Sequence, residues 1–529
     1  MNLSTFLEHW RIVENPFRGE EARQDPVFRR LEAAGPPREG APGFTTHSDF
    51  EKVLGDFARP STSIVFGEKG SGKTAMRLQL AERVGAWNAA NPGQRCLLVP
   101  YDELNPVLDR FNERIGSERK PNIPEALGKF RLADHMDAIL ALIVPRIVDT
   151  LLKEEWPSVS GVPGGAGALD LGPEPRKQVR RVDAGQRQDL LLLQAVYDRP
   201  ERAERRTRKL RRVLRLSPPG RVWVWALLAY AGWLAPAGLA YWAWENKKLD
   251  LNGGWAIYTV AALTALWLLV VAKRSIWDRL SFLRLAHRVR RQVRVNGRSD
   301  VSLARSLRQI DPGATDAGLL PVTASEEHRY AMLDRLRRLL SHFGYASLMI
   351  IVDRVDEPTL IAGDPERMRA VIWPMLNNKF LQQSGLGVKM LLPMELRHAL
   401  FRESAAFFQE ARLDKQNLIE RLNWTGAMLY DLCNARLRAC IDPSAQDGAP
   451  SALLDLFAED VTRQDLVDAL DQMHQPRDAF KMVYQCLVEH CSNVTQDEAQ
   501  WRVPRLVLEN VRKQQVERVR QFSSGVRPA

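Results

Sequence analysis

The feature that most limits what this chain can fold into is the segment STSIVFGEKGSGKTAMRLQLAERV, which begins at Ser61. Its apolar run predicts a buried strand, its three glycines a tight loop, and its last ten residues a helix. In such a loop backbone N–H groups turn toward an anion, and the helix directs the positive end of its dipole to the same place. An ordinary glycine-rich turn is the alternative, but it does not explain the lysine and threonine at Lys73 and Thr74. The segment therefore predicts a phosphate-binding loop.

This loop predicts ATP and Mg²⁺ as ligands. Lys73 would reach the β and γ phosphates, and the Thr74 hydroxyl would ligate Mg²⁺. The predicted nucleotide-binding residues are Gly67, Glu68, Lys69, Gly70, Ser71, Gly72, Lys73, Thr74 and Ala75.

A second strand supplies acids for the same site. SLMIIVDRVDE, from Ser347, places five successive apolar residues before Asp353, which would hold Mg²⁺ directly or through water. Asp356 or Glu357 could orient and deprotonate the attacking water. The alternative is a strand that ends in solvated acids. Because 279 residues separate Lys73 from Asp353, the nucleotide-binding domain must contain a long insertion.

Two uncharged runs in that insertion predict a membrane hairpin. VWVWALLAYAGWLAPAGLAYWAW covers 222–244 and GGWAIYTVAALTALWLLVVA covers 253–272, each long enough to cross about 30 Å of hydrocarbon. Tryptophan and tyrosine gather near their ends, as interface anchors do, and Pro236 could kink the first span. A pair of buried helices in a soluble core is the alternative.

The flanks of the hairpin are basic. Each flank carries nine Lys or Arg, against two lysines in the loop between the spans, so both flanks should be cytoplasmic. They account for much of the net charge of +11, and anionic lipid is their simplest partner. Nucleic acid is the alternative partner, since phosphates select the same chemistry. With no export signal and five scattered cysteines, we expect a multi-pass protein of the inner membrane with its soluble parts in the cytoplasm.

Two further strands are expected in the nucleotide domain. They begin near Arg95 and near Val388, in RCLLVPYDEL and VKMLLPMEL. Glu395 and Arg397 follow the second strand, where a polar residue could sense the γ phosphate. Both could equally be solvated residues at the end of a strand.

The chain after Leu400 predicts a helical lid. ERLNWTGAMLYDLCNARLRAC places Leu422, Leu429, Leu432 and Leu437 at helical spacing, with Trp424 as a core anchor, and SALLDLFAED, LVDALDQM and FKMVYQCLVEHC predict further helices. Arg477 falls in the first turn of a lid helix, where it could contact the γ phosphate, or it could be an ordinary surface arginine.

Together these motifs resemble the KAP-type P-loop NTPases, within the STAND and AAA+ neighbourhood, which carry transmembrane helices inserted in the P-loop domain. The resemblance implies Lys73 and Thr74 as phosphate and Mg²⁺ contacts, Asp353 as the metal acid and Arg477 as a lid sensor. This sequence differs from that family at Arg354, where such proteins usually have a second aspartate. The resemblance also implies an ATPase that acts in signalling, including bacterial defence against phage, beside a partner encoded by a neighbouring gene.

We therefore expect an α/β fold: a three-layer P-loop NTPase core with a parallel sheet, an inserted membrane hairpin on basic helical stalks, and an all-helical lid. The predicted divisions are a leading N-terminal segment (1–55), a first core part (56–150), the insertion (151–325), a second core part (326–415) and the lid (416–529). The insertion includes a flexible linker at 161–167. The expected function is a membrane-anchored, homo-oligomeric ATP switch. A channel or transport subunit and a membrane-held ATPase that handles DNA or RNA are the alternatives.

Overall fold

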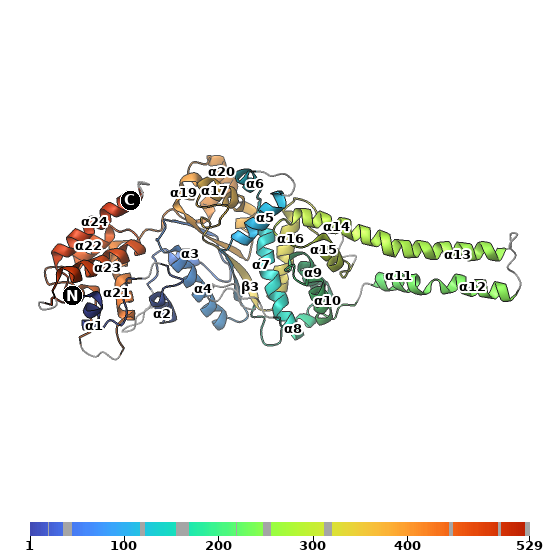
Figure 1. Cartoon of the computed structure of the whole chain (residues 1–529), viewed down its shortest axis with the longest axis horizontal. Helices are drawn as coiled ribbons and strands as arrows, with labels where there is room; N and C mark the ends of the chain where they lie inside the picture. The colour runs from blue at the N-terminus through green and yellow to red at the C-terminus, as the bar shows by residue number, and fades with distance from the viewer. Residues whose placement is uncertain are drawn as a thin grey trace. The chain divides into compact units, whose positions relative to one another are not determined.

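The computed structural model divides the chain into two compact units. Unit 1 comprises Met1–Asp102, Ser347–Arg369 and Leu376–Ala529, and unit 2 comprises Glu103–Ala346 and Ala370–Met375 (Figure 1). The residues that the structure describes are 1–18, 21–34, 45–116, 122–154, 169–217, 220–246, 255–311, 320–443, 448–495 and 499–523. The predicted linker at 161–167 and most of the predicted loop between the two membrane spans lie outside these residues.

The strands form one five-stranded parallel sheet in the order β2-β3-β4-β1-β5. Ile64 of β1 pairs with Met390 on one side and with Leu418 on the other. Every residue of β1 and β4 is buried, as expected for parallel strands covered on both faces. The strands are β1 Ser63–Gly67, β2 Arg95–Tyr101, β3 Tyr345–Val352, β4 Leu386–Pro393 and β5 Asn417–Ile419. The predicted α/β class and the strands predicted near Arg95, Ser347 and Val388 are confirmed.

Helices α3 (Phe50–Leu54) and α4 (Lys73–Ala90) pack against this sheet. Their apolar side chains form a core with inward residues of the strands, among them Val65, Ile351 and Leu391. After β4 the chain turns directly into α19 (Met394–Leu400), and Figure 1 shows α19 and α4 on different sides of the strands. The short helices α18 (Asn378–Leu381) and α20 (Ala405–Ala411) complete this part.

A second hydrophobic core in unit 1 joins the two ends of the chain. Phe6 packs edge-on to His490, and the indole of Trp10 donates to the carbonyl oxygen of Trp501 at 2.8 Å. The N-terminal segment thus packs into the C-terminal helices instead of only leading into the sheet. The helices involved are α1 Leu3–His9, α2 Pro26–Ala34, α21 Gly426–Ala439, α22 Arg463–Asp471, α23 Pro476–Asn493 and α24 Arg505–Ser523.

Two predictions for this helical region are wrong in detail. Leu422 is not on a helix: its N–H donates to Phe66 O at 2.8 Å beside the sheet, and α21 begins only after Thr425, whose hydroxyl caps it. SALLDLFAED forms no α-helix but one 3-10 turn, Leu453–Leu456. This turn ends early because the next residue, Phe457, bridges to Val503 in extended conformation.

Unit 2 contains a helical bundle with buried ion pairs. Arg329 is fully buried against Asp137, and Arg206 is buried between Asp149 and Asp198. The bundle comprises α5 Asn105–Gly116, α6 Ile123–Leu127, α7 Leu132–Leu152, α8 Pro175–Arg181, α9 Ala184–Tyr197, α10 Ala203–Val213, α15 Asp300–Leu307 and α16 Glu327–Ser341. Because α7 and α16 pack on α9, the insertion extends over 103–346, beyond the predicted 151–325.

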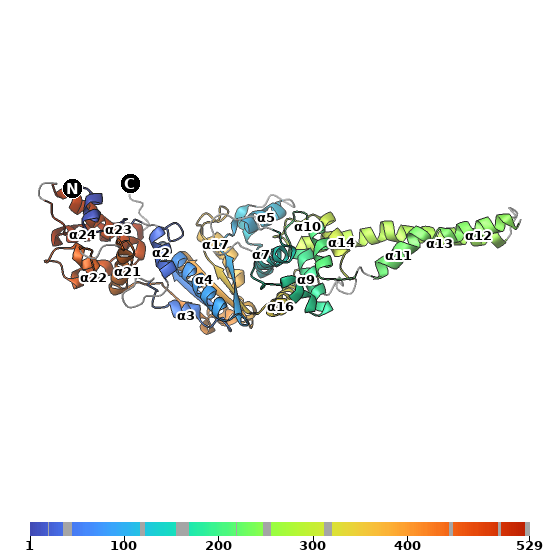
Figure 2. The ribbon, with the colours of Figure 1, turned by 90° about the horizontal axis from the view of Figure 1, so that it is seen from below.

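The hairpin of unit 2 contains two helices long and apolar enough to cross a membrane. The first comprises α11 (Gly220–Ala231) and α12 (Leu234–Glu245), and the second begins with α13 (Trp255–Ala272). Helix α13 continues without a break through a π-helical turn (Lys273–Trp277) into the basic helix α14 (Asp278–Gln292). Figure 1 shows α12 and α13 side by side, and in Figure 2 they overlap along the same stretch, in agreement with their contacts.

The first span is interrupted at Gly232 and Trp233. Pro236 has no N–H to donate to the carbonyl of Gly232, which explains a break at this point. Beside the break, the indole of Trp267 in α13 donates to Ala229 O at 3.1 Å. A side chain of α13 thus donates to a carbonyl oxygen of α11 three residues before the break.

Candidate functional site

The loop from Gly67 to Thr74 joins β1 to α4 within unit 1. Gly70 and Gly72 have φ of +101° and +92°, the left-handed region that favours glycine. A Cβ on Gly67 would stand 2.4 Å from Ser71 Oγ, so the Ser71 side chain packs closely on the remaining glycine of the loop. The loop thus ends at the N-terminus of an 18-residue helix, in the arrangement that binds anions.

Lys73 closes the loop from inside. Its Nζ donates to the carbonyl oxygens of Gly67 at 2.6 Å and Glu68 at 2.9 Å. Burial lowers the pKa of Lys73, and nearby carboxylates, led by Asp353, oppose that effect. The two carbonyl oxygens therefore hold the Lys73 ammonium group within the loop, and the nearby Asp353 favours its charged form.

Asp353 directly follows the last residue of β3 and lines the same cavity as Lys73. The residue is 1% exposed, and Oδ1 accepts the N–H of Arg354 at 2.9 Å. Its Oδ2 accepts no hydrogen bond from the described part of the chain. Burial raises the pKa of Asp353, while Arg77 and Lys73 act to lower it.

Two arginines beside this acid were not predicted. Arg77 of α4 places Nε 3.6 Å from Asp353 Oδ2, and its Nη1 donates to Asp102 Oδ2. Arg23, in the N-terminal segment, donates to the same oxygen of Asp102. No sequence motif marks either arginine, since their relation to Asp353 depends on β2 and β3 being neighbours in the sheet.

The other three predicted acids differ in their exposure and in their contacts. Asp356 is half-buried and lines the cavity. Glu357 also lines it, but its carboxylate is engaged by Arg354 at 2.5 Å. Glu395 is exposed on α19 and does not line the cavity, although it is close enough to act on the charge of Lys73.

Residues just before the C-terminal helices α21 and α23 make three polar contacts with the glycine loop. The indole of Trp424 donates to Ser71 O at 2.8 Å. Arg421 donates to Glu68 Oε1 at 2.7 Å, and Gln475 donates to Glu68 Oε2. Trp424 is therefore both the buried core residue that was predicted and a direct contact of the loop.

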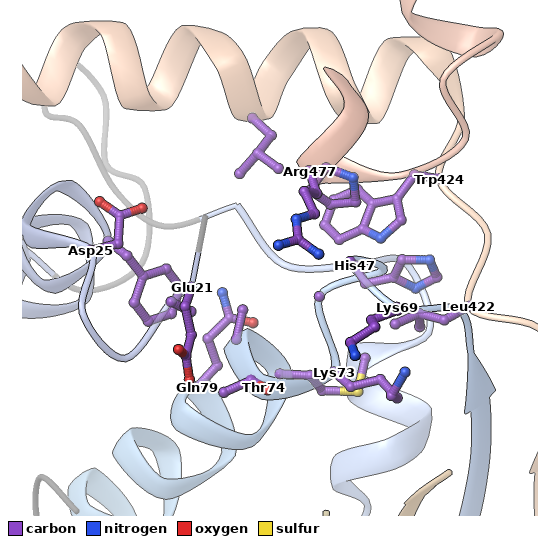
Figure 3. A pocket seen from close by; sticks show the side chains of 18 of the residues that line it. Glu21, Asp25, His47, Lys69, Lys73, Thr74, Gln79, Leu422, Trp424 and Arg477 are labelled. Carbon is purple, nitrogen blue, oxygen red and sulfur yellow. The ribbon is translucent and has the colours of Figure 1, made fainter. Parts of the chain in front are cut away.

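Arg477 lies where the lid sensor was predicted, in the first turn of α23. A Cβ on Gly70 would stand 3.0 Å from two carbons of its side chain, so the arginine lies directly over the loop. Figure 3 shows Arg477 and Trp424 across the cavity from Lys73 and Thr74. Arg397, the other candidate sensor, instead pairs with Glu420 at 2.8 Å.

His47 supports this side of the cavity and was not predicted. Its ring lies edge-on to Trp424, with centroids 5.0 Å apart. Its Nδ1 accepts the N–H of Asp49 at 3.1 Å, and its Nε2 lies 2.9 Å from Asn423 O, which assigns the proton to Nε2. Burial lowers the pKa of His47, in keeping with a neutral ring.

Lys73, Thr74, Asp353, Trp424 and Arg477 line one cavity of about 310 Å³ within unit 1, a size suited to a small organic ligand. Besides its charged residues, the lining includes the apolar side chains of Phe28, Leu31, Leu432 and Phe480. Glu21, Asp25 and Gln79 also line the cavity. Phe28 and Leu31 come from α2, a helix that no sequence motif connects with the site.

Few side chains of the cavity could bind a metal ion. Over the described ranges, no group of three or more His, Cys, Asp or Glu could hold an ion. Mg²⁺ does not need such a group, because it is commonly held by one or two protein oxygens together with phosphates and water. The unpaired Oδ2 of Asp353 and the hydroxyl of Thr74 fit that requirement.

Compared with protein families, with curated proteins and with solved structures, the chain matches none. Any function assigned to the chain therefore rests on the geometry of the cavity and on the chemistry of its lining residues.

Proposed function

We propose that this chain is a membrane-anchored P-loop ATPase, of the KAP and STAND-like kind, that acts as a nucleotide-dependent switch. The observation that carries the proposal is one cavity lined by Lys73, Thr74, Asp353 and Arg477. These residues come from distant parts of the sequence and combine the groups that bind a triphosphate: donors, a metal acid and a cation on a separate helical element.

Each residue has a distinct part in this proposal. Lys73 and the N–H groups of the glycine loop bind the β and γ phosphates of ATP, and the Thr74 hydroxyl and Asp353 hold Mg²⁺. When bound, the metal neutralises charge on the phosphates. Arg477 contacts the γ phosphate from the lid, and Asp356 orients the attacking water.

The contacts between the glycine loop and the segments that precede α21 and α23 support the switch. Arg421 and Gln475 engage Glu68, and Trp424 engages Ser71, so a movement of the loop around phosphates changes contacts made by the lid. Hydrolysis of ATP ends the contact between Arg477 and the γ phosphate. The loss of this contact shifts the equilibrium between two positions of the lid.

The hairpin is proposed to anchor the protein in the inner membrane. Lys273 lies 3.6 Å over the ring of Trp225, which suits an interface between lipid and cytoplasm. Basic residues next to the spans would bind anionic headgroups. In this arrangement unit 1 is a three-layer ATPase core with its lid in the cytoplasm, and it acts as a homo-oligomer or on an effector encoded nearby.

An aqueous channel through the hairpin is less consistent with its polar groups. Thr259 and Thr264 are hydroxyl-bearing residues of α13, and both hydroxyls bond to carbonyls of their own helix. They therefore offer little to the lining of an ion path.

Equilibrium binding of a fluorescent ATP analogue to the full-length protein in detergent tests the nucleotide site. Lys73→Ala should weaken binding about tenfold to a hundredfold, because each charge-assisted hydrogen bond contributes about 1.5–3 kcal/mol. Lys129→Ala, which removes an exposed lysine of unit 2, is the matched control. Equal affinities of wild type and Lys73→Ala would contradict the proposal.

Fractionation tests the anchor. Full-length protein should remain with membranes after an alkaline carbonate wash and should dissolve only in detergent. A chain that is soluble without detergent would refute the membrane part of the proposal and leave the nucleotide site untouched. DNA-stimulated ATP turnover would instead favour the nucleic-acid alternative.

A further inference from the structure

Four buried or half-buried side chains of alternating charge lead away from the acid at the end of β3. In order they are Asp353, Arg77, Asp102 and Arg23. Asp102 directly follows β2, the strand beside β3, so the two acids stand at the ends of neighbouring strands. Arg77 comes from α4, one turn after Lys73, and lies between them.

The two links of Arg77 differ in kind. Its Nη1 donates a hydrogen bond to Asp102, whereas its Nε is 3.6 Å from Asp353 Oδ2, too far for a hydrogen bond. Arg77 Nε and Nη2 and Asp353 Oδ2 are all buried without a hydrogen-bond partner among the described residues. Asp102 therefore fixes the guanidinium, which faces Asp353 only as a charge.

We infer that Arg77 is a positioning residue that acts as the counter-cation of Asp353 and makes Mg²⁺ binding depend on nucleotide. The inference rests on the proposed function. A buried carboxylate without a counter-charge costs several kcal/mol, and Arg77 offsets that cost when no nucleotide is bound. A divalent cation at Oδ2 would be repelled by the guanidinium, so the cation binds well only together with the negative charge of a triphosphate.

Asp102 sets the strength of this effect. It shares the charge of Arg77 and also that of Arg23. Neutralising Asp102 would leave Arg77 more strongly attracted to Asp353. Neutralising Arg77 would leave Asp353 available to a cation alone. The two changes should therefore move the Mg²⁺ requirement in opposite directions.

The test measures thermal stability of the full-length protein in detergent as Mg²⁺ is titrated, with and without a non-hydrolysable ATP analogue. Arg77→Met should lower the Mg²⁺ concentration for half-maximal stabilisation on the order of tenfold, and Asp102→Asn should raise it by a similar factor. Arg77→Met should also be stabilised by Mg²⁺ without nucleotide, which the wild type should not be. Arg77→Lys keeps the charge and should resemble the wild type.

Arg83→Met is the matched control, since it removes an arginine of the same helix that pairs with Glu51 outside the site. If Arg77→Met does not fold, Asp102→Asn still tests the inference by the direction of its shift. Shifts of Arg77→Met and Asp102→Asn in the same direction, or no shift in either, would overturn it. A wild type that shows no Mg²⁺-dependent nucleotide binding would instead refute the proposed function on which it rests.

Discussion

The indole nitrogen of Trp424 donates a hydrogen bond to the carbonyl oxygen of Ser71 at 2.8 Å, across 353 residues of sequence. Ser71 belongs to the glycine loop, and Trp424 precedes the first helix of the C-terminal cluster. The same indole ring lies 3.6 Å from the position of a Cβ on Gly72. One side chain therefore fixes both the position and the backbone orientation of the loop.

Trp424→Phe separates these two effects. The phenyl ring keeps most of the packing but cannot donate to Ser71, and a lost hydrogen bond of this kind costs about 1 kcal/mol. We expect affinity for the ATP analogue to fall about fivefold, measured by equilibrium binding. An unchanged affinity would show that the hydrogen bond does not shape the loop.

Gly70→Ala should abolish nucleotide binding. A methyl group there would stand 3.0 Å from Arg477, on a backbone at φ +101° that L residues rarely adopt. Gly85→Ala is the control: it is in the middle of α4 with nothing within 4 Å, and it should stabilise the helix by about 1 kcal/mol. Binding and melting temperature of the two variants give the comparison. Binding by Gly70→Ala at wild-type affinity would mean that the loop rearranges freely.

Asp356→Asn should slow ATP hydrolysis more than Glu357→Gln. Both residues line the cavity, but the Glu357 carboxylate is engaged by Arg354, whereas Asp356 acts on the charge of Lys73. Steady-state turnover should fall on the order of a hundredfold for Asp356→Asn, as expected for loss of a general base, with nucleotide affinity retained. The reverse order of the two variants would assign the water to Glu357.

Lys389 offers a pH test of the fold. It is fully buried in the middle of the sheet, donates to Ser61 O at 2.7 Å, and burial lowers its pKa to about 8. Between pH 8 and its ordinary pKa of 10.5 the unfolded chain holds more protons, so this group makes stability rise with pH over that window. Below pH 8 its buried charge is a destabilising contribution.

Lys389→Met should therefore stabilise the protein at pH 7. The gain is on the order of 3 kcal/mol, less about 1 kcal/mol for lost hydrogen bonds, and it should vanish by about pH 10. The melting-temperature difference between variant and wild type across this range measures it, with Lys52→Met as an exposed control. A melting-temperature difference that stays constant with pH would contradict the lowered pKa of Lys389.

Local pattern alone predicted the parts of the site that lie on single segments. The loop before α4 and the acid at the end of β3 could be located because strand, glycine spacing and charge all occur within about a dozen residues. Arg477 could be placed in the first turn of a helix because proline is favoured at the first position of helices and Pro476 directly precedes Arg477. Both inferences needed no knowledge of strand order.

The rest of the site depends on contacts that sequence spacing does not contain. Arg77 looks like any polar residue of an amphipathic helix until β2 is known to be beside β3. His47 and Phe28 precede the glycine loop in segments without a motif, and only the packing of the N-terminal segment brings them to the cavity. Leu422 was assigned to a helix because its spacing matches one, while pairing beside β1 determines its conformation.

The strand order also determines when the sheet can be made during synthesis. Among the described strands, β1 pairs with β4 and β5, and the neighbour of β2 is β3. More than 240 residues separate the end of β2 from the start of β3, and a ribosome takes on the order of 10–50 s to translate them. Both apolar hairpin helices therefore leave the ribosome before any two strands can pair. The sheet is completed on a nascent chain whose two membrane-length helices have already been synthesised.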